Sequence, residues 1–153
     1  MVELERHKHS IGQSAYHFVW RPKYNFKVFR HPYPRMVCVE ALKTVAKKWK
    51  IKIYEMEVMQ DHVHVFAEVP PTMTVSFALQ ILKGGSARIF FKRCRIWRLF
   101  FLERGLKLHL WSPGKFFRSV GCVTAEVVHS YIKYSNKWEF EFLKKNQTTL
   151  NAY

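Results

Sequence analysis

The sequence predicts an α+β domain in which helices cover one face of an antiparallel β-sheet. Apolar residues alternate with other residues in several short runs, as strands require, and recur at helical spacing between those runs. Hydrophobic residues make up 48% of the 153 residues, so the chain can bury a core without a disulfide or a structural metal. We therefore expect residues 1–153 to form one domain, with its core over about residues 14–140.

The first half of the chain alternates between strand and helix patterns. Arg21-Pro22 ends the first strand, because proline cannot donate a ladder hydrogen bond. The helix that follows has Val39, Leu42 and Val45 at helical spacing. The expected elements are a strand at 14–20, a stiff proline-containing connector at 31–34, a helix at 35–49, a strand at 50–59, a turn at 60–61 and a strand at 62–69.

The second half continues the pattern and gives the order β-α-β-β-α-β-α. Thr74 is the expected N-cap of the second helix, and Thr124 of the last one. Gly84-Gly85 weakens the second helix, and close approach of another backbone is one reason to tolerate the pair. The expected elements are a helix at 75–91, a basic linker at 93–108, one or two short strands within 107–120 with a turn at 112–114, a helix from 124, and a frayed polar tail from 144.

The first six of these elements have the ferredoxin-like (RRM-like) order. In this arrangement two helices lie on one face of the sheet. We expect the other face to be free for a partner or a further element. The last helix follows this core.

The charge points to a polyanionic partner. Lys and Arg number 26 and Asp and Glu 11, so the formal charge is +15 and the pI is about 10.0. The hydrophobic content and 16% aromatic residues exclude a basic disordered tail. A folded domain with a cationic surface is typical of nucleic-acid binding, and the alternative is a soluble protein that is merely basic.

Several classes of protein are disfavoured. Cys38, Cys94 and Cys122 are scattered and odd in number, which indicates a reducing compartment and neither a disulfide framework nor a zinc site. The charged residues 1–6 do not resemble a signal peptide. Basic residues interrupt the apolar stretch 89–102, so it cannot span a bilayer, and a basic amphipathic helix on a membrane surface is the weaker alternative. No nucleotide-binding glycine motif is present.

His62-Val63-His64 is the most informative motif. In a strand, residues two apart point the same way, so His62, His64 and Phe66 share one face, while Val63 and Val65 belong in the core. Two imidazoles with Cα atoms ~7 Å apart can hold one divalent cation and leave positions open for a substrate. The alternative is a pair of surface histidines that only bind phosphates when protonated.

The last predicted helix offers a candidate nucleophile. Val123, Val127 and Tyr131 recur at helical spacing, so Tyr131 is either an aromatic at the edge of the core or a functional phenol. A tyrosine attacks a phosphate poorly unless the phosphate is polarised by a metal and nearby cations. Tyr134, one turn later, is the competing candidate.

Five segments together resemble the single-tyrosine (Y1, HUH) transposases of the IS200/IS605 insertion-sequence group. They span about residues 14–140 and occur in the order the family has. The segments are HFVWRPKY at 17–24, HVH at 62–64, KGGSAR at 83–88, WSPG at 111–114 and Tyr131-Ile132.

The resemblance implies a specific activity. Members of this family are dimers that cut and rejoin single-stranded DNA and recognise hairpins near the ends of the element. By this resemblance, His62 and His64 bind Mg²⁺ or Mn²⁺, and Tyr131 forms a 5′-phosphotyrosine link that frees a 3′-hydroxyl. It also implies a prokaryotic protein that acts in the cytoplasm, associated with the nucleoid.

One position departs from the family. Four residues after the tyrosine the family usually has a glutamine that serves as a third metal ligand, and Ser135 stands there in this chain. Asn136, the next residue, offers a similar amide oxygen. Asp61 is expected to point away from the histidines if the strand has begun there.

The basic residues are expected to contact the DNA backbone, which would make binding strongly salt-dependent. The candidates are Lys83, Arg88, Lys92, Arg93, Arg95 and Arg98. Two other functions remain open: a non-catalytic or decayed RRM-like module that binds single-stranded nucleic acid, and a metal-dependent nuclease that hydrolyses without rejoining.

Overall fold

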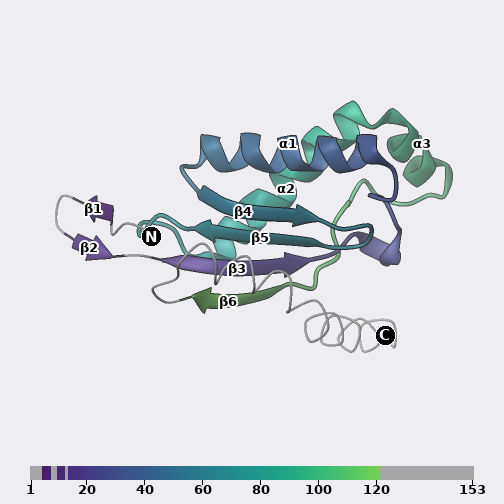
Figure 1. Ribbon diagram of the computed structural model, residues 1–153. Coiled ribbons are helices and arrows are strands. Elements are labelled where there is room, and N and C mark those ends of the chain that lie inside the picture. Colours follow the sequence, from purple (N-terminus) through teal and green to yellow (C-terminus); the bar gives the residue numbers. More distant parts are fainter. Residues whose placement is uncertain (1–4, 8–9, 13, 121–153) are drawn as a thin grey trace.

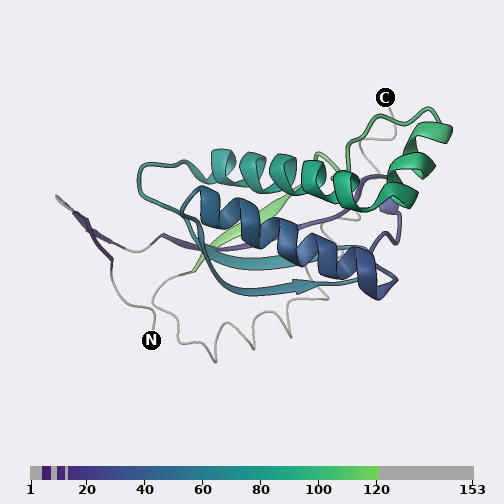
Figure 2. The same ribbon diagram turned by 90° about the horizontal axis from the view of Figure 1, so that it is seen from above.

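A computed structural model describes residues 5–7, 10–12 and 14–120. Figure 1 shows their arrangement, and Figure 2 shows it from above. The elements are β1 (Glu5–His7), β2 (Ser10–Gly12), β3 (Ala15–Trp20), the short 3₁₀ helix η1 (Lys23–Asn25), α1 (Pro32–Lys48), β4 (Lys52–Val58), β5 (Val63–Glu68), α2 (Val75–Arg93), α3 (Arg95–Glu103) and β6 (Phe116–Val120). The expected tyrosine helix lies outside the described residues.

The main sheet confirms the predicted ferredoxin-like architecture. Its strands lie in the order β4-β5-β3-β6, and every neighbouring pair is antiparallel. Helices α1 and α2 lie side by side on one face (Figures 1 and 2). A separate antiparallel pair, β1 with β2, precedes this sheet and was not predicted.

The residues at the start of each long helix explain where that helix begins. Helix α1 starts at Pro32, three residues before the predicted start, because prolines in the first turn lack only an amide hydrogen that the helix does not use. Helix α2 starts as predicted: the Thr74 side chain accepts a hydrogen bond from the Phe77 amide at 3.2 Å. The pair of prolines taken for a connector is therefore part of a helix.

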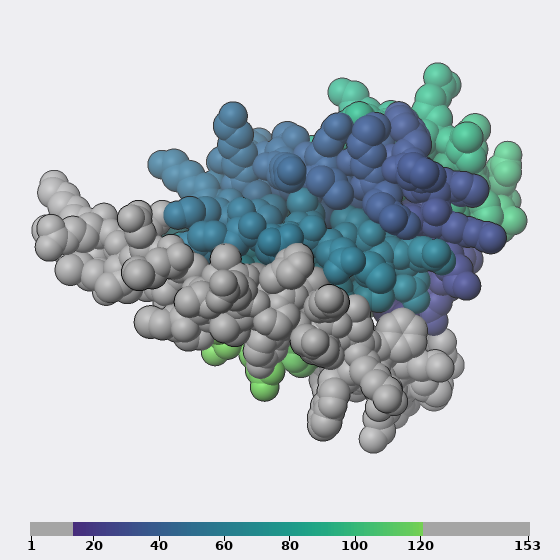
Figure 3. All heavy atoms as spheres, viewed as in Figure 1, coloured from purple at the N-terminus to yellow at the C-terminus, as the bar shows by residue number. Residues whose placement is uncertain are grey.

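The basic linker expected over residues 93–108 is wrong, because α3 occupies much of it. Phe101 on α3 is fully buried, with its ring centre 5.1 Å from that of Phe91 and 5.8 Å from that of Phe26. These contacts of Phe101 stabilise a short helix in a segment whose charged residues suggested a loop. Helix α3 lies at the end of the molecule where α1 begins (Figures 1 and 3). None of the helices described here is long and apolar enough to cross a membrane.

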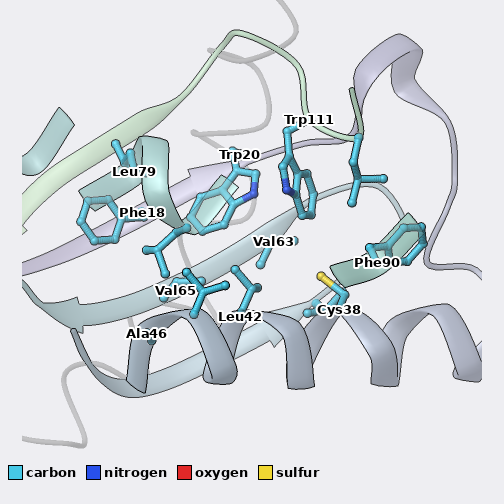
Figure 4. Packing of buried hydrophobic residues seen from close by; sticks show 14 of the residues in the cluster. Phe18, Trp20, Cys38, Leu42, Ala46, Val63, Val65, Leu79, Phe90 and Trp111 are labelled. Atoms are coloured by element: carbon cyan, nitrogen blue, oxygen red, sulfur yellow. The ribbon is translucent and has the colours of Figure 1, made fainter. Parts of the chain in front are cut away.

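The core lies between the sheet and helices α1 and α2. Phe18 and Trp20 of β3 and Val63 and Val65 of β5 point towards the helices, where they meet side chains such as Leu42 (Figure 4). All of them are completely buried. The valine face of β5 is therefore in the core, as the alternation predicted.

The two adjacent glycines of α2 have different surroundings. A Cβ at Gly85 would lie only 2.7 Å from Cγ2 of Val45 on α1, whereas a Cβ at Gly84 would have no atom within 4 Å. Gly85 therefore allows the two helices to approach closely. The predicted reason, close approach of another backbone, is therefore not what the structure shows: the atoms nearest to Gly85 belong to the Val45 side chain, and Gly84 has open space.

Candidate functional site

The histidine pair lies on the face of the sheet opposite α1 and α2. Strand β5 begins at Val63, so His62 immediately precedes it and His64 is its second residue. The two imidazole centres lie 4.9 Å apart, with ring planes at 76°. The predicted shared face is confirmed, but both residues are buried, with 8% of His62 and 1% of His64 exposed. This face is not open to solvent at these residues.

Asp61 points towards His62. The expectation that it points away applied only if the strand had begun at Asp61, and β5 begins at Val63. Its Oδ1 lies 2.8 Å from Nδ1 of His62, and its Oδ2 lies 3.6 Å from an Nη atom of Arg21. Asp61 belongs to the turn before β5, so strand alternation does not apply to it. The hydrogen bond to His62 and the nearby Arg21 guanidinium lower the pKa of Asp61, against the opposing effect of burial.

A third histidine, His17 of β3, joins the site and was not among the predicted site residues. Its Nε2 lies 3.1 Å from Nδ1 of His64. Strand pairing places Val19 opposite His64 and His17 opposite Phe66, so His17 is a diagonal neighbour on the same face. Alternation places His17 on the face opposite Phe18, but the local sequence contains no signal for the register with β5.

These contacts constrain how the histidines would bind a metal. Nδ1 of His62 faces Asp61 and Nδ1 of His64 faces His17, so a metal shared by the two rings would bind at Nε2 of each. Among the described residues, no group of three or more His, Cys, Asp or Glu side chains could hold a metal ion. The described residues therefore offer two candidate nitrogen ligands, His62 and His64. The predicted third ligand, Asn136, lies outside the described residues, as do Tyr131, Tyr134 and Ser135.

A second candidate region is a basic pocket of about 930 Å³ beside α2. It brings together Lys83, Arg88, Lys92 and Arg98 of the predicted DNA contacts. Two of the predicted contacts, Arg93 and Arg95, do not line it, and Arg93 forms an ion pair with Glu40 of α1. The structure also adds two cationic side chains that the sequence analysis did not select, Lys23 and Lys115.

Lys83 holds one wall of this pocket in place. Its ammonium donates to the carbonyl oxygens of Ser112 at 2.7 Å, Gly114 at 3.3 Å and Pro113 at 3.5 Å. Burial, helped by the charge of Lys115, lowers the pKa of Lys83 to about 8. Lys83 is therefore an anchor for the 112–114 loop as well as a candidate DNA contact.

The pocket loop is also tied to the histidine site. The Trp111 indole donates to Ser86 Oγ of α2 at 2.9 Å, which fixes the start of the loop. The Ser112 amide donates to the Arg21 carbonyl oxygen at 3.0 Å, and the Arg21 side chain approaches Asp61. The segments KGGSAR (83–88) and HFVWRPKY (17–24) therefore each form hydrogen bonds with WSPG (111–114), and these bonds bring the three segments together.

A comparison with known protein families covers the segments described above. The family model described as "Transposase IS200 like" matches residues 10–135. The chain belongs to the IS200-like transposase family. The matched range contains His62, His64 and Tyr131, and it ends at Ser135, one residue before Asn136.

Relatives of this transposase family cover most of the chain. It is 29% identical over 126 residues to the transposase for insertion sequence element IS200 of Salmonella typhimurium, which covers 82% of this chain and 79% of the relative. It is 26% identical over 137 residues to the ISDra2 transposase TnpA of Deinococcus radiodurans, covering 86% and 91%. The resemblance stated from the five segments is therefore confirmed.

Solved structures confirm the fold. A crystal structure from Deinococcus radiodurans R1, of a protein assigned as a transposase, aligns with a TM-score of 0.66 at 22% identity, covering 85% of this chain and 96% of that one. A REP-associated tyrosine transposase bound to a REP hairpin aligns with a TM-score of 0.55 at 18% identity, covering 92% and 74%. At these identities the likeness establishes the shared α+β architecture alone.

Proposed function

We propose that this member of the transposase family cleaves and rejoins single-stranded DNA at the ends of an insertion sequence through a 5′-phosphotyrosine intermediate on Tyr131. The observation that carries the proposal is the buried pair of His62 and His64, each with Nδ1 turned to a protein partner. Buried imidazoles oriented in this way are typical of metal ligands. The family match supports the same activity.

The residues present fit a divalent cation, Mg²⁺ or Mn²⁺. His62 and His64 would hold it through Nε2, Asp61 would orient His62, and Asn136 is the proposed third ligand. When bound, the cation would neutralise charge that builds up on the scissile phosphate. Two nitrogen ligands leave positions for substrate oxygens, as a catalytic site requires.

The proposed reaction is a phosphoryl transfer that conserves bond energy. The Tyr131 oxygen attacks the phosphorus and loses its proton, the bond to the 3′ oxygen breaks, and that oxygen gains a proton to become a 3′-hydroxyl. The 5′ end stays linked to the tyrosine. Attack by a 3′-hydroxyl reverses the step, so rejoining needs no ATP.

The basic pocket is the proposed contact with the DNA backbone. Arg88, Lys92 and Arg98 line it beside the loop that Lys83 anchors. Phosphate contacts by such residues release counterions, so binding should weaken steeply with salt. The transposase of similar fold that is bound to a REP hairpin supports hairpin DNA as the ligand. We propose that the protein acts as a homodimer on DNA in the cytoplasm, associated with the nucleoid.

A denaturing gel tests the reaction. The protein is mixed with Mn²⁺ and single-stranded DNA that carries an element end, and a covalent protein–DNA adduct is expected. Tyr131→Phe and a chelator should each abolish the adduct, while Tyr134→Phe, the matched control, should retain it. The opposite pattern would make Tyr134 the nucleophile. Cut strands without an adduct would favour a hydrolytic nuclease, and DNA binding without cutting would favour a non-catalytic or decayed module.

A further inference from the structure

The contact between His17 and His64 has the geometry of an in-plane hydrogen bond. The ring planes differ by 11°, and the ring centres lie 5.3 Å apart. Nε2 of His17 lies 3.1 Å from Nδ1 of His64. The centres are farther apart than these nitrogens by about two ring radii, so the line between the nitrogens runs along both ring planes. The rings therefore meet edge to edge, where nitrogen lone pairs and N–H bonds point.

A hydrogen bond between two neutral imidazoles needs one proton, and two arrangements supply it. In the first, Nδ1–H of His64 donates to Nε2 of His17, which leaves the Nε2 lone pair of His64 able to bind a metal. In the second, Nε2–H of His17 donates to Nδ1 of His64, and the proton on His64 then lies at Nε2, where it blocks a metal. Only the first arrangement allows His64 to act as a ligand.

We propose that His17 is a positioning residue that accepts the Nδ1–H hydrogen bond of His64 and so directs Nε2 of His64 towards the metal. This inference rests on the proposed metal role of His62 and His64. The two ligands would then be oriented by different groups, His62 by the Asp61 carboxylate and His64 by a neutral imidazole on a neighbouring strand.

The position of His17 suits this role. Its side chain is 2% exposed, so packing fixes its orientation. It lies on β3, which pairs with β5 over six consecutive residue pairs that end at Trp20 and Val63. A partner held on a strand of the same sheet keeps the acceptor at a fixed distance from His64.

Titration with Mn²⁺ in a calorimeter tests the role with variants. His17→Phe keeps a flat ring and removes the acceptor, so Mn²⁺ affinity should fall by about 10- to 100-fold. His17→Gln places an amide oxygen near the lost nitrogen and should recover most of that affinity. His31→Phe replaces an exposed histidine at the start of α1 and should bind Mn²⁺ like the unaltered protein. Thermal melting of each variant reports its folding.

The outcomes separate this inference from the proposed function. If His62→Ala loses Mn²⁺ binding while His17→Phe retains it, the metal site stands and the role of His17 is refuted. A folded His17→Gln that binds as weakly as His17→Phe also refutes it, because the acceptor would not matter. An unaltered protein that binds no Mn²⁺ overturns both.

Nitrogen NMR of the unaltered protein tests the same inference without any variant. With ¹⁵N-labelled histidine, long-range proton–nitrogen correlations show which ring nitrogen carries the proton. We expect His64 to carry it at Nδ1 and His17 to present an unprotonated Nε2. A proton on Nε2 of His17, with Nδ1 of His64 unprotonated, would overturn the proposal even if His17→Phe does not fold.

Discussion

The two faces of the main sheet are both buried at their centre but are built from different chemistry. On the helix side, Phe18 and Val65 pack among apolar groups and are fully buried. On the other side, His17 and His64 are almost as deeply buried and form a hydrogen bond with each other. Buried apolar groups need only a close fit, whereas buried polar groups need partners.

This difference divides the work between alternate residues of the same strands. Val63 and Val65 of β5 stabilise the fold, while His64 between them provides a candidate ligand. Substitutions on the helix side should therefore act through the free energy of unfolding. Substitutions on the histidine side should act mainly through metal binding and DNA cleavage.

The largest expected effect comes from Phe18→Ala. Removing a fully buried phenylalanine side chain leaves a cavity and should lower the free energy of unfolding by about 3–5 kcal/mol, measured by urea denaturation. His62→Ala is the counterpart on the other face and should lose Mn²⁺ binding while retaining most of the stability. Equal destabilisation by the two substitutions would contradict the division between the faces.

The glycine pair of α2 offers a sharper comparison within the helix layer. Gly85→Ala would press a methyl group against Val45 and should destabilise the fold by about 1–3 kcal/mol, because the close approach of α1 leaves no room. Gly84→Ala, where space is open, should stabilise the fold by up to about 1 kcal/mol through helix propensity. Thermal melting of both variants measures the difference, and similar melting temperatures would argue that the α1–α2 packing adjusts easily.

How much of this site the sequence could predict depends on whether the signal is local. Strand alternation has a period of two, so it placed Val63 and His64 on opposite faces correctly. The contact of His17 with His64 depends on strand register, which joins residues 47 positions apart and has no local signature. For the same reason the sequence could not predict the hydrogen bond from Lys83 to the Ser112 carbonyl oxygen, which joins residues 29 positions apart.

A local signal also misled the prediction for residues 93–108. Basic residues between Arg93 and Leu108 suggested a loop, but burial of Phe101 by tertiary contacts stabilises α3 there. The deciding contact there is made by the folded chain. At Asp61 the orientation depended on where the strand begins, and because β5 begins at Val63, strand alternation does not apply to Asp61.

Lys83 and Lys92, both lining the basic pocket, provide a further matched pair. Lys83→Met removes the ammonium that donates to three loop carbonyls and should lower the free energy of unfolding by about 1–3 kcal/mol. Lys92 is exposed, so Lys92→Met should leave stability unchanged and reduce the salt dependence of DNA binding by about one counterion. Urea denaturation and binding titrations over a salt series measure the two effects. A loss of salt dependence in Lys83→Met without a loss of stability would make Lys83 a DNA contact only.

The smallest effect concerns the cysteine thiols on the helix side of the sheet. It tests whether water reaches the buried residues there. Burial raises the pKa of Cys94 to about 11, against the opposing effect of the Arg93 charge, and burial also raises the pKa of Cys38. At pH 9 about 1% of the Cys94 side chains would be thiolate, compared with about half for a thiol at the ordinary pKa of 9.0. Native Cys94 should therefore react with iodoacetamide about 50-fold more slowly than in urea.

Peptide mass spectrometry measures this rate at each cysteine separately, so Cys122 does not obscure the result. Raising the pH from 7 to 9 should speed alkylation of Cys94 in the unfolded chain until its thiol approaches half ionisation. In the folded protein the rate should keep rising up to about pH 11, because the pKa is higher there. If Cys94 reacted equally fast in both states, water would reach the junction of α2 and α3, and burial on the helix side would not extend to its end.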